Sequence, residues 1–325
     1  MQNHCNLMRP LHAPAICLIA LLSIGTASAH AAGDAASSNL RTVHAGETEL
    51  QIEVIGIDNP ARVAMLQGWA VEAAQATVLP SGRFPLRSAR VEVREIDSRS
   101  SSPVPWGQTS RRDDVSILLY VRRGASHEQL RADWTAVHEF SHLAHPYLGQ
   151  RGRWLAEGLA SYHQNLLRAR AGLLAPDETW RRLDAGFRRG EAVRDGATLE
   201  AMGRQRGGTM RVYWAGAAYW LEMELTLRRD HDTTLQGVLD RYAQCCLDGT
   251  AHVAPEDFVV ALDRAAGVEL FARRYRDYAG STVFPSLADS YGVLGIERHG
   301  DGLRFSEARA ARTMREAMTE ALPLR

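Results

Sequence analysis

The most restrictive feature of the sequence is the pentapeptide His138-Glu139-Phe140-Ser141-His142. Two histidines four positions apart lie one turn apart on the same side of an α-helix, so their imidazoles can converge on a single ion. Zinc accepts neutral imidazole nitrogen and prefers tetrahedral coordination. Glu139 lies near the same face, where its carboxylate can reach a zinc-bound water without ligating the metal. The pattern therefore predicts a helix here and a further ligand from elsewhere.

Glu157 is the nearest good candidate for the third ligand, with 14 residues between it and His142. Pro146 and the glycines at 149 and 152 allow the chain to turn, so that a second helix can pack across the first. We therefore predict one Zn²⁺ ion held by His138, His142 and Glu157, with a fourth position open. The alternative is a surface helix with two solvated histidines and a Glu157 that is satisfied otherwise.

Hydrophobic periodicity places this pair of helices in a chain that begins with strands and continues with helices. We expect strands at 49–55, 91–96 and 115–121, a helix at 61–77 and a loop at 97–114. A capping box formed by Ser126 and Gln129 should begin a helix that continues to Pro146. Further helices are expected at 153–170, 178–188, 209–229, 233–244, 255–265, 268–278 and 306–321.

This order predicts an α+β protein with an N-terminal mixed β-sheet lobe that carries the zinc helix, followed by a helical C-terminal lobe. The expected divisions are a signal peptide at 1–29, a flexible leader at 30–47, the sheet lobe with both site helices at 48–171, and the helical lobe at 172–325.

The first thirty residues have the pattern of a secretory signal peptide. Arg9 precedes an apolar run at 13–24, and Ala27-Ser28-Ala29 resembles a cleavage site. The run is short for a membrane span, and an uncleaved anchor is the alternative. We therefore expect an exported protein, periplasmic or secreted, with no other membrane association.

Composition excludes several other classes of function. Acidic and basic residues balance at 38 each, so no global field favours nucleic acid. The sequence contains no lysine, which excludes a Schiff-base or P-loop lysine. Cleavage after Ala29 would leave only the adjacent Cys245 and Cys246. A bridge between neighbours is geometrically disfavoured, so we expect two thiols in a helical core.

The motifs resemble those of a known group of enzymes. H-E-x-x-H, followed by Trp154-Leu155-Ala156-Glu157-Gly158 and then Leu159-Ala160-Ser161-Tyr162, is similar to the gluzincin metallopeptidases. Within this group it most resembles the catalytic domain of the glycyl-aminopeptidase family, whose members often carry a PDZ domain. A second similar block is Val212 to Leu221, and the resemblance spans about 110–295. No segment resembles the PDZ domain.

The resemblance implies a zincin fold of the thermolysin type, His138, His142 and Glu157 as zinc ligands, and Glu139 as the general base. It also implies that Tyr213 stabilises the oxyanion, a role that suits a phenol donor; Tyr219 and Tyr162 are weaker alternatives. The strand at 115–121 should border the cleft, and the Pro105-Trp106-Gly107 segment is a candidate for its wall.

Other residues near the motif have less certain roles. His145 is expected to cap the helix end or to be partly exposed, and a role beside the zinc ligands is the alternative. Ser161 is expected either to hold an imidazole or to serve helix packing. His163 is expected to be structural.

Two departures from the related aminopeptidases limit what the resemblance implies. The sequence lacks the upstream G-x-M-E-N segment that anchors a free amino terminus there. The spacing from His142 to Glu157 is also shorter than the eighteen residues found in those enzymes. The zinc chemistry therefore transfers better than the aminopeptidase specificity.

We accordingly expect a zinc metallopeptidase, a hydrolase whose partner is a peptide or protein substrate. The alternatives are an exported zinc-binding protein without peptidase turnover and an amidase acting on a cell-wall peptide. The sequence leaves open the substrate, the exo- or endopeptidase mode and the oligomeric state.

Overall fold

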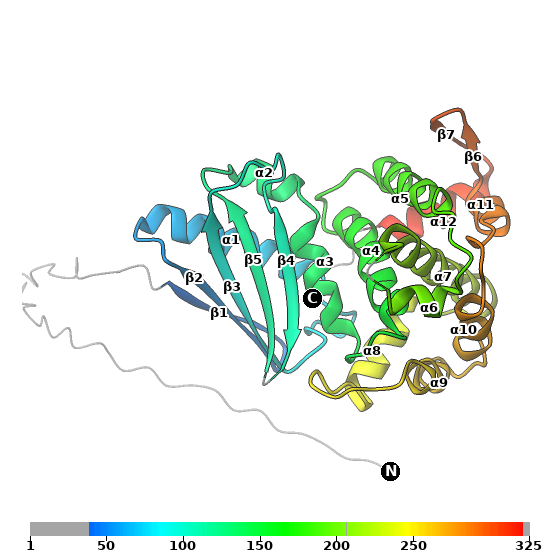
Figure 1. The fold of residues 1–325 in the computed structure, drawn as a ribbon, viewed down its shortest axis with the longest axis horizontal. Coiled ribbons are helices and arrows are strands. Elements are labelled where there is room, and N and C mark those ends of the chain that lie inside the picture. Colours follow the sequence, from blue (N-terminus) through cyan, green and yellow to red (C-terminus); the bar gives the residue numbers. More distant parts are fainter. Residues whose placement is uncertain (1–38, 113, 206, 321–325) are drawn as a thin grey trace, which may run out of the picture. The chain divides into compact units, whose positions relative to one another are not determined.

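Three strands with alternating buried residues and two edge strands form a five-stranded mixed sheet in the computed structural model (Figure 1). They are β1 (Leu40–Ala45), β2 (Thr48–Ile55), β3 (Ser88–Ile96), β4 (Trp106–Arg111) and β5 (Val115–Arg122), in the spatial order β1-β2-β3-β5-β4. β2, β3 and β5 run parallel, whereas β1 and β4 are antiparallel to their neighbours. The structure describes residues 39–112, 114–205 and 207–320, which lie in one compact unit of the chain.

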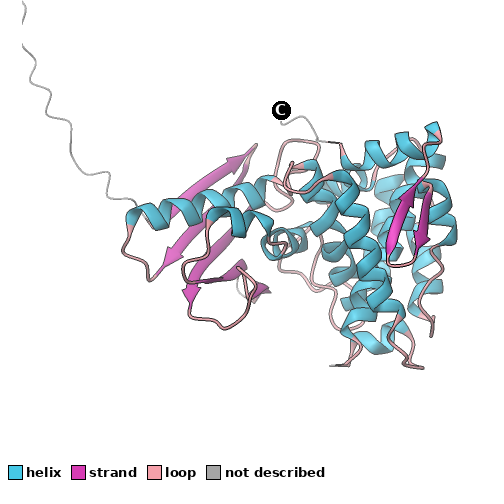
Figure 2. Ribbon diagram, turned by 90° about the horizontal axis from the view of Figure 1, so that it is seen from above, coloured by secondary structure: helices cyan, strands magenta, loops and turns pink. Residues whose placement is uncertain are grey.

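Three helices, one long and two short, pack in the same apolar core as the sheet. These are α1 (Pro60–Gln75), α2 (His127–Ala132) and α3 (Thr135–Ser141), and Figure 2 shows a long helix lying along the sheet. α1 supplies the crossover between the parallel strands β2 and β3. Val137 and Phe140 of α3 join the same apolar core as Ile117 of β5, so the core of the sheet fixes the helix that carries His138.

The rest of the described chain is mainly helical. A 3₁₀ turn, η1 (His142–Ala144), leads to α4 (Arg153–Arg170), and the later elements are α5 (Pro176–Glu191), α6 (Leu199–Gly203), α7 (Thr209–Asp230), α8 (Leu235–Cys245), α9 (Pro255–Ala266), α10 (Phe271–Ala279), α11 (Ala288–Leu294), β6 (Ile296–His299), β7 (Gly302–Phe305) and α12 (Arg309–Thr319). In Figure 1, α3 lies between the sheet and these helices.

The centre of the helical part is the contact between α4 and α7. Gly158 and Gly216 face each other so closely that a Cβ on Gly158 would lie 2.4 Å from the Cα of Gly216. A Cβ on Gly216 would lie 2.0 Å from the carbonyl oxygen of Trp154. The absence of side chains at this crossing therefore allows backbone-to-backbone packing, which holds α4 in place.

The α+β class and the order of strands before helices are confirmed, as is the capping box of Ser126 and Gln129. Three local expectations were wrong. Part of the expected leader forms β1, because its backbone pairs with β2. The expected loop at 97–114 contains β4, which pairs with β5. The helix expected from 126 to 146 is broken at Asp133, whose extended backbone separates α2 from α3 and whose carboxylate accepts from the Thr135 N–H.

The expectation of two thiols in a helical core was also wrong. Cys245 and Cys246 are exposed and form a disulfide with each other. Cys245 is the last residue of α8, and Cys246 has a non-helical backbone. The pair therefore lies where the chain leaves the helix, outside the core.

The predicted signal peptide at 1–29 lies outside the described residues. Within the part of the chain that the structure describes, no helix is both long and apolar enough to span a bilayer.

Candidate metal centre

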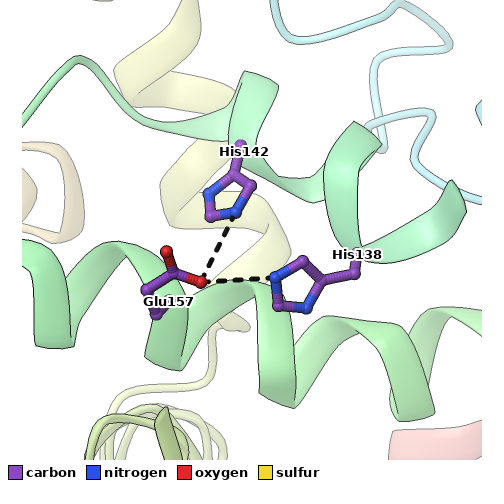
Figure 3. A group of neighbouring side chains, drawn as sticks. All are labelled: His138, His142 and Glu157. Atoms are coloured by element: carbon purple, nitrogen blue, oxygen red, sulfur yellow. Dashed lines mark ion pairs between the residues drawn. The ribbon is translucent and has the colours of Figure 1, made fainter. Parts of the chain in front are cut away.

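Three predicted ligands meet between α3, η1 and α4. His138 lies in the last turn of α3, His142 begins η1, and Glu157 lies in the second turn of α4. Figure 3 shows the two imidazoles and the carboxylate pointing toward one another. The Nε2 atoms of His138 and His142 lie 3.4 Å and 3.8 Å from Oε2 of Glu157. The structure therefore brings together the three side chains that the sequence pattern selected.

The spacing of these atoms fits a single metal ion. All three ligand atoms lie within 4.8 Å of one another. Tetrahedral zinc with bonds of about 2.0–2.1 Å would place its ligand atoms roughly 3.3 Å apart. Two imidazole nitrogens and one carboxylate oxygen are also a donor set found in catalytic zinc sites. These residues could hold a zinc ion with small shifts of their side chains.

The protonation states of two of the three side chains fit a cation as well. Burial lowers the pKa of His142 to about 3, which keeps the imidazole neutral at pH 7. Burial alone would raise the pKa of Glu157, but the hydrogen bond with His138 and the nearby histidines outweigh it and lower that pKa to about 2. Burial would lower the pKa of His138, and its contacts with the carboxylates of Glu157 and Glu139 raise it instead. His142 and Glu157 thus already have the protonation states that a metal ligand needs, whereas His138 would release a proton when a metal binds.

Each histidine is oriented by a partner on its other nitrogen. Nδ1 of His138 lies 2.8 Å from Oε1 of Gln164 on α4. Nδ1 of His142 lies 3.0 Å from Nε2 of His145, whose own Nδ1 donates to the carbonyl of Pro146 at 2.7 Å. This chain of bonds makes Nδ1 the protonated nitrogen of His142 and leaves its Nε2 lone pair facing Glu157.

These contacts decide the open roles of two residues. His145 is 4% exposed, so the expectation of a partly exposed side chain was wrong. It is the C-cap residue of η1, as expected, and its ring lies against His142 with centroids 5.2 Å apart. In the described structure, Gln164 rather than Ser161 contacts the imidazole of His138. His163 is buried and lies beside Gln236 of α8, as expected of a structural residue.

Glu139 lines the same cavity as the three candidate ligands but does not belong to their group. The hydroxyl of Thr109 on β4 lies 2.9 Å from its Oε2 and 3.0 Å from its carbonyl oxygen. Burial raises the pKa of Glu139. Gly107 of the same strand is needed for this approach, because a Cβ there would lie 2.7 Å from Cγ of Glu139. β4 therefore positions the carboxylate that the motif supplies.

Arg111, at the end of β4, fixes the end of the zinc helix. Its buried guanidinium donates to the backbone carbonyls of His142, His145 and Gly249. Burial lowers the pKa of Arg111 to about 10, so it stays charged at neutral pH. This one side chain satisfies carbonyls that α3 and η1 leave open at their C-terminal end.

Tyr213, in the first turns of α7, is the tyrosine that reaches the centre. Its ring stacks against His138 with centroids 6.1 Å apart, and its hydrogen bond with Glu157 contributes to the lowered pKa of that carboxylate. Burial raises the pKa of Tyr213 itself, so the phenol keeps its proton. Tyr219 and Tyr162 are buried in the helical core, where the hydroxyl of Tyr219 donates to the carbonyl of Phe271.

A cavity of about 730 Å³ opens onto this centre. It is lined by β4 from Gly107 onward, by the three ligand residues, by Glu139 and by Tyr213. The cleft strand is therefore β4 and not the expected 115–121 strand, because β5 is paired on both sides whereas β4 lies at the edge of the sheet. The Pro105-Trp106-Gly107 segment contributes Gly107 to the cavity wall.

Sequence reasoning missed Thr109, Arg111 and Gln164. Thr109 and Arg111 act from a strand whose polar sequence, Trp106 to Arg111, carries no apolar alternation. Gln164 lies on α4 two turns after Glu157, and that helical spacing was a usable signal. The other two contacts depend on strand pairing and could not be read from the local pattern.

No protein-family model matches the chain, and no curated protein matches it. Among solved structures, the chain is similar to an aminopeptidase N family protein from Idiomarina loihiensis, with 15% identity and a TM-score of 0.57 over 79% of this chain and 49% of that chain. It also matches an M1 zinc metallopeptidase from Deinococcus radiodurans (14% identity, TM-score 0.46, 76% of this chain and 52% of that chain). A third match is aminopeptidase A from Legionella pneumophila (14% identity, TM-score 0.48, 75% of this chain and 28% of that chain).

The likeness to the Idiomarina protein shows a shared fold and agrees with the gluzincin architecture expected from the motifs. The chain spans about half of that protein's length. The resemblance to glycyl-aminopeptidases in particular stays a prediction from the sequence motifs. The chain is therefore similar in fold to an aminopeptidase N family protein and carries a histidine-histidine-glutamate group that could bind a metal.

Proposed function

We propose that the chain is a zinc-dependent metallopeptidase in which His138, His142 and Glu157 bind one Zn²⁺ ion. The observation that carries the proposal is the convergence of these three ligand atoms within 4.8 Å at the floor of an open cavity. Glu139 lines the same cavity but is held by Thr109. This combination of a three-ligand site, an open position and an adjacent carboxylate is what metal-assisted hydrolysis requires.

Each residue around the candidate metal site has a defined role in this mechanism. A zinc ion held by His138, His142 and Glu157 would polarise the scissile carbonyl and lower the pKa of an attacking water. Glu139, whose own pKa is raised by burial, takes a proton from that water and returns it to the leaving amine. Tyr213 keeps its proton and donates a hydrogen bond to the developing oxyanion. Gln164 and His145 hold the imidazoles in the ligating tautomer.

We also propose that an extended substrate lies along β4. This strand is at the edge of the sheet and lines the cavity with Gly107, Gln108, Thr109 and Ser110. An edge strand offers unpaired backbone groups to a peptide, and β-strand addition is a recurring mode of peptide recognition. The scissile bond of such a peptide would pass between β4 and α4.

The test is a cleavage profile on a peptide library, with and without a chelator, for the wild type and Glu139→Gln. The variant should keep its zinc and lose about 10²–10⁴-fold in turnover, because only proton transfer is removed. Glu128→Gln is the matched control, since Glu128 is an exposed carboxylate on the neighbouring helix α2. Near-normal turnover of Glu139→Gln would remove Glu139 from the mechanism.

Other results of the same assay separate the alternatives. Zinc at one equivalent with no cleavage of any peptide would favour a zinc-binding protein without turnover. Cleavage confined to cell-wall peptides would favour an amidase of that kind. The resemblance to glycyl-aminopeptidases and the lobe boundary near residue 171 are further proposals from the sequence.

We further propose that the protein is exported. The support is the signal-peptide pattern of residues 1–29. Expression of the full chain, cell fractionation and N-terminal sequencing of the product test it. A mature protein that begins near residue 30 outside the cytoplasm is the expected result, and an intact cytoplasmic chain would contradict it.

A further inference from the structure

The cleft beside the metal centre is cationic, although the whole chain balances 38 acidic against 38 basic residues. The 730 Å³ cavity and an adjoining cavity of about 430 Å³ share Tyr213. Among the described residues that line them, the only carboxylates are Glu139 and Glu157, both engaged at the metal centre. The arginines that line them are Arg111, Arg112, Arg153, Arg182 and Arg189.

Three of these arginines are already engaged. Arg111 donates to three backbone carbonyls. Arg182 forms an ion pair with Glu178 on its own helix. The guanidinium of Arg189 covers the ring of Trp214 at 5.1 Å. Each of these contacts explains the arginine without a ligand.

Arg153 is different. Its guanidinium lies 5.8 Å from the ring centre of Tyr213. It hydrogen-bonds the hydroxyl of Tyr213 and donates to the carbonyl of Gln205 at 3.2 Å. Within the described part of the chain, no carboxylate lies within ion-pair distance of it. A partly buried cation at the cavity wall therefore keeps most of its donors for a ligand.

The position of Arg153 relates it directly to the reacting centre. It precedes Glu157 by four residues on α4, so both side chains lie on the same face of the helix. His138 and Arg153 both contact the ring of Tyr213, at 6.1 Å and 5.8 Å. An extended peptide advances about 3.3–3.6 Å per residue, so Arg153 is within about three residues of a bond cleaved at the zinc.

We propose that Arg153 binds a carboxylate of the substrate, so that the enzyme acts on anionic peptides and does not recognise a free amino terminus. The inference rests on the proposed peptidase function. A guanidinium presents paired N–H donors that match a carboxylate, whereas an ammonium group would meet only positive charge in this cleft beyond Glu139 and the metal ligands. Arg112, which also lines the cavity, adds to the same positive field.

The test uses one cleavable peptide in four forms: with a free C-terminal carboxylate, with a C-terminal amide, with an acidic side chain replaced by its amide, and with an acetylated amino terminus. We expect acetylation to change kcat/KM by less than about threefold. Loss of the recognised carboxylate should lower kcat/KM by about 10–100-fold, mainly through KM, as for a charged hydrogen bond. The amide that causes the loss identifies the carboxylate as terminal or as a side chain.

The variant Arg153→Gln should bring the ratio of kcat/KM between the acid and amide peptides close to one, and Arg153→Lys should restore part of it. Arg151→Gln is the matched control, because Arg151 is two residues away and pairs with Glu200 and Glu256. Zinc content and circular dichroism are measured on each variant. The wild-type comparison of the four peptides needs no variant and remains decisive if one fails to fold.

The outcomes separate this inference from the proposed function. Absence of zinc-dependent cleavage of all four peptides would overturn the peptidase itself. Cleavage that requires a free amino terminus, or that ignores both carboxylates, would overturn the role of Arg153 and leave the peptidase intact. An equal fall of kcat on the acid and amide peptides in Arg153→Gln would show that Arg153 only positions Tyr213, which also overturns it.

Discussion

The two helices that supply the candidate metal ligands are held in place by different means. α3 has seven residues and no side-chain cap at Trp134, and it passes directly into a 3₁₀ turn. α4 has 18 residues, nearly all buried. Side chains hold α3: Val137 and Phe140 pack in the sheet core, and Thr109 of β4 bonds to the carbonyl of Glu139. α4 instead depends on its glycine crossing with α7. The two histidines are thus positioned by side-chain contacts with the sheet, and the glutamate by backbone packing.

If backbone packing holds α4, the largest loss of stability should come from adding a side chain at its crossing with α7. Gly216→Ala would place a Cβ 2.0 Å from the carbonyl oxygen of Trp154, which forces the helices apart. We expect a loss of about 3 kcal/mol or more in the free energy of unfolding, measured by urea denaturation, together with weaker zinc binding as Glu157 shifts. Gly68→Ala in α1 is the control, since nothing lies within 4 Å of its Cβ position.

A free energy of unfolding within about 1 kcal/mol of the wild type in Gly216→Ala would contradict this account of α4. It would mean that α4 is held by its side chains, as α3 is, and the contrast between the two helices would disappear.

Loss of Arg111, which bonds to carbonyls that follow α3, should lower the stability of the protein. Arg111→Met removes the donor that three backbone carbonyls share. We expect a loss of about 2 kcal/mol in the free energy of unfolding, because carbonyls that accept from a charged donor lose their partner. Arg94→Met, at an exposed position of β3 paired with Glu92, should change it by less than about 1 kcal/mol. Equal effects of the two variants would dismiss the role given to Arg111.

Replacing the residues that hydrogen-bond the two imidazoles should have a smaller effect on stability but should clearly weaken zinc binding. His145→Phe and Gln164→Met each remove the hydrogen-bond partner of one histidine. We expect zinc affinity, measured by competition with a chelating dye, to fall about 10–100-fold in each. Ser161→Ala is the control, because the imidazole of His138 is bonded to Gln164 instead. A loss of affinity in Ser161→Ala comparable to that in Gln164→Met would restore the role the sequence suggested for Ser161.

The smallest predicted effect concerns the far side of α4. His163 is buried beside Gln236, and burial lowers its pKa to about 3. An unfolded histidine titrates near pH 6.5, so the unfolded chain takes up the proton first. The stability due to neutral His163 is therefore complete above about pH 6.5 and is lost as the pH falls toward 3.

Urea denaturation of the wild type and of His163→Gln at the same zinc loading should reveal this pH-dependent contribution of His163 to stability. Between pH 7 and pH 5.5, the wild type should lose about 1 kcal/mol more than the variant. Parallel pH profiles would mean that His163 is hydrated in the folded protein, and α4 would then be less completely enclosed than its burial indicates.

Much of the site could be predicted from local sequence. The helix at 153–170 was predicted correctly, and the three candidate ligand side chains do converge, because helical periodicity, the i, i+4 histidines and the glycine-linked turn are properties of neighbouring residues. The break at Asp133 was missed because a local hydrogen bond from its carboxylate to Thr135 overrides an otherwise helical pattern.

The sequence by itself therefore determined which side chains converge on one point and which carboxylate lies beside them. Only the tertiary structure decided which strand forms the cleft wall, which residues hold the imidazoles, and that Arg153 lies beside Tyr213 at the cavity wall. The physical reason is the separation in sequence between the residues that interact. Ligand spacing follows from 3.6 residues per helical turn, whereas the contacts of Thr109, Arg111 and Arg153 depend on strand order and helix crossings that join distant parts of the chain.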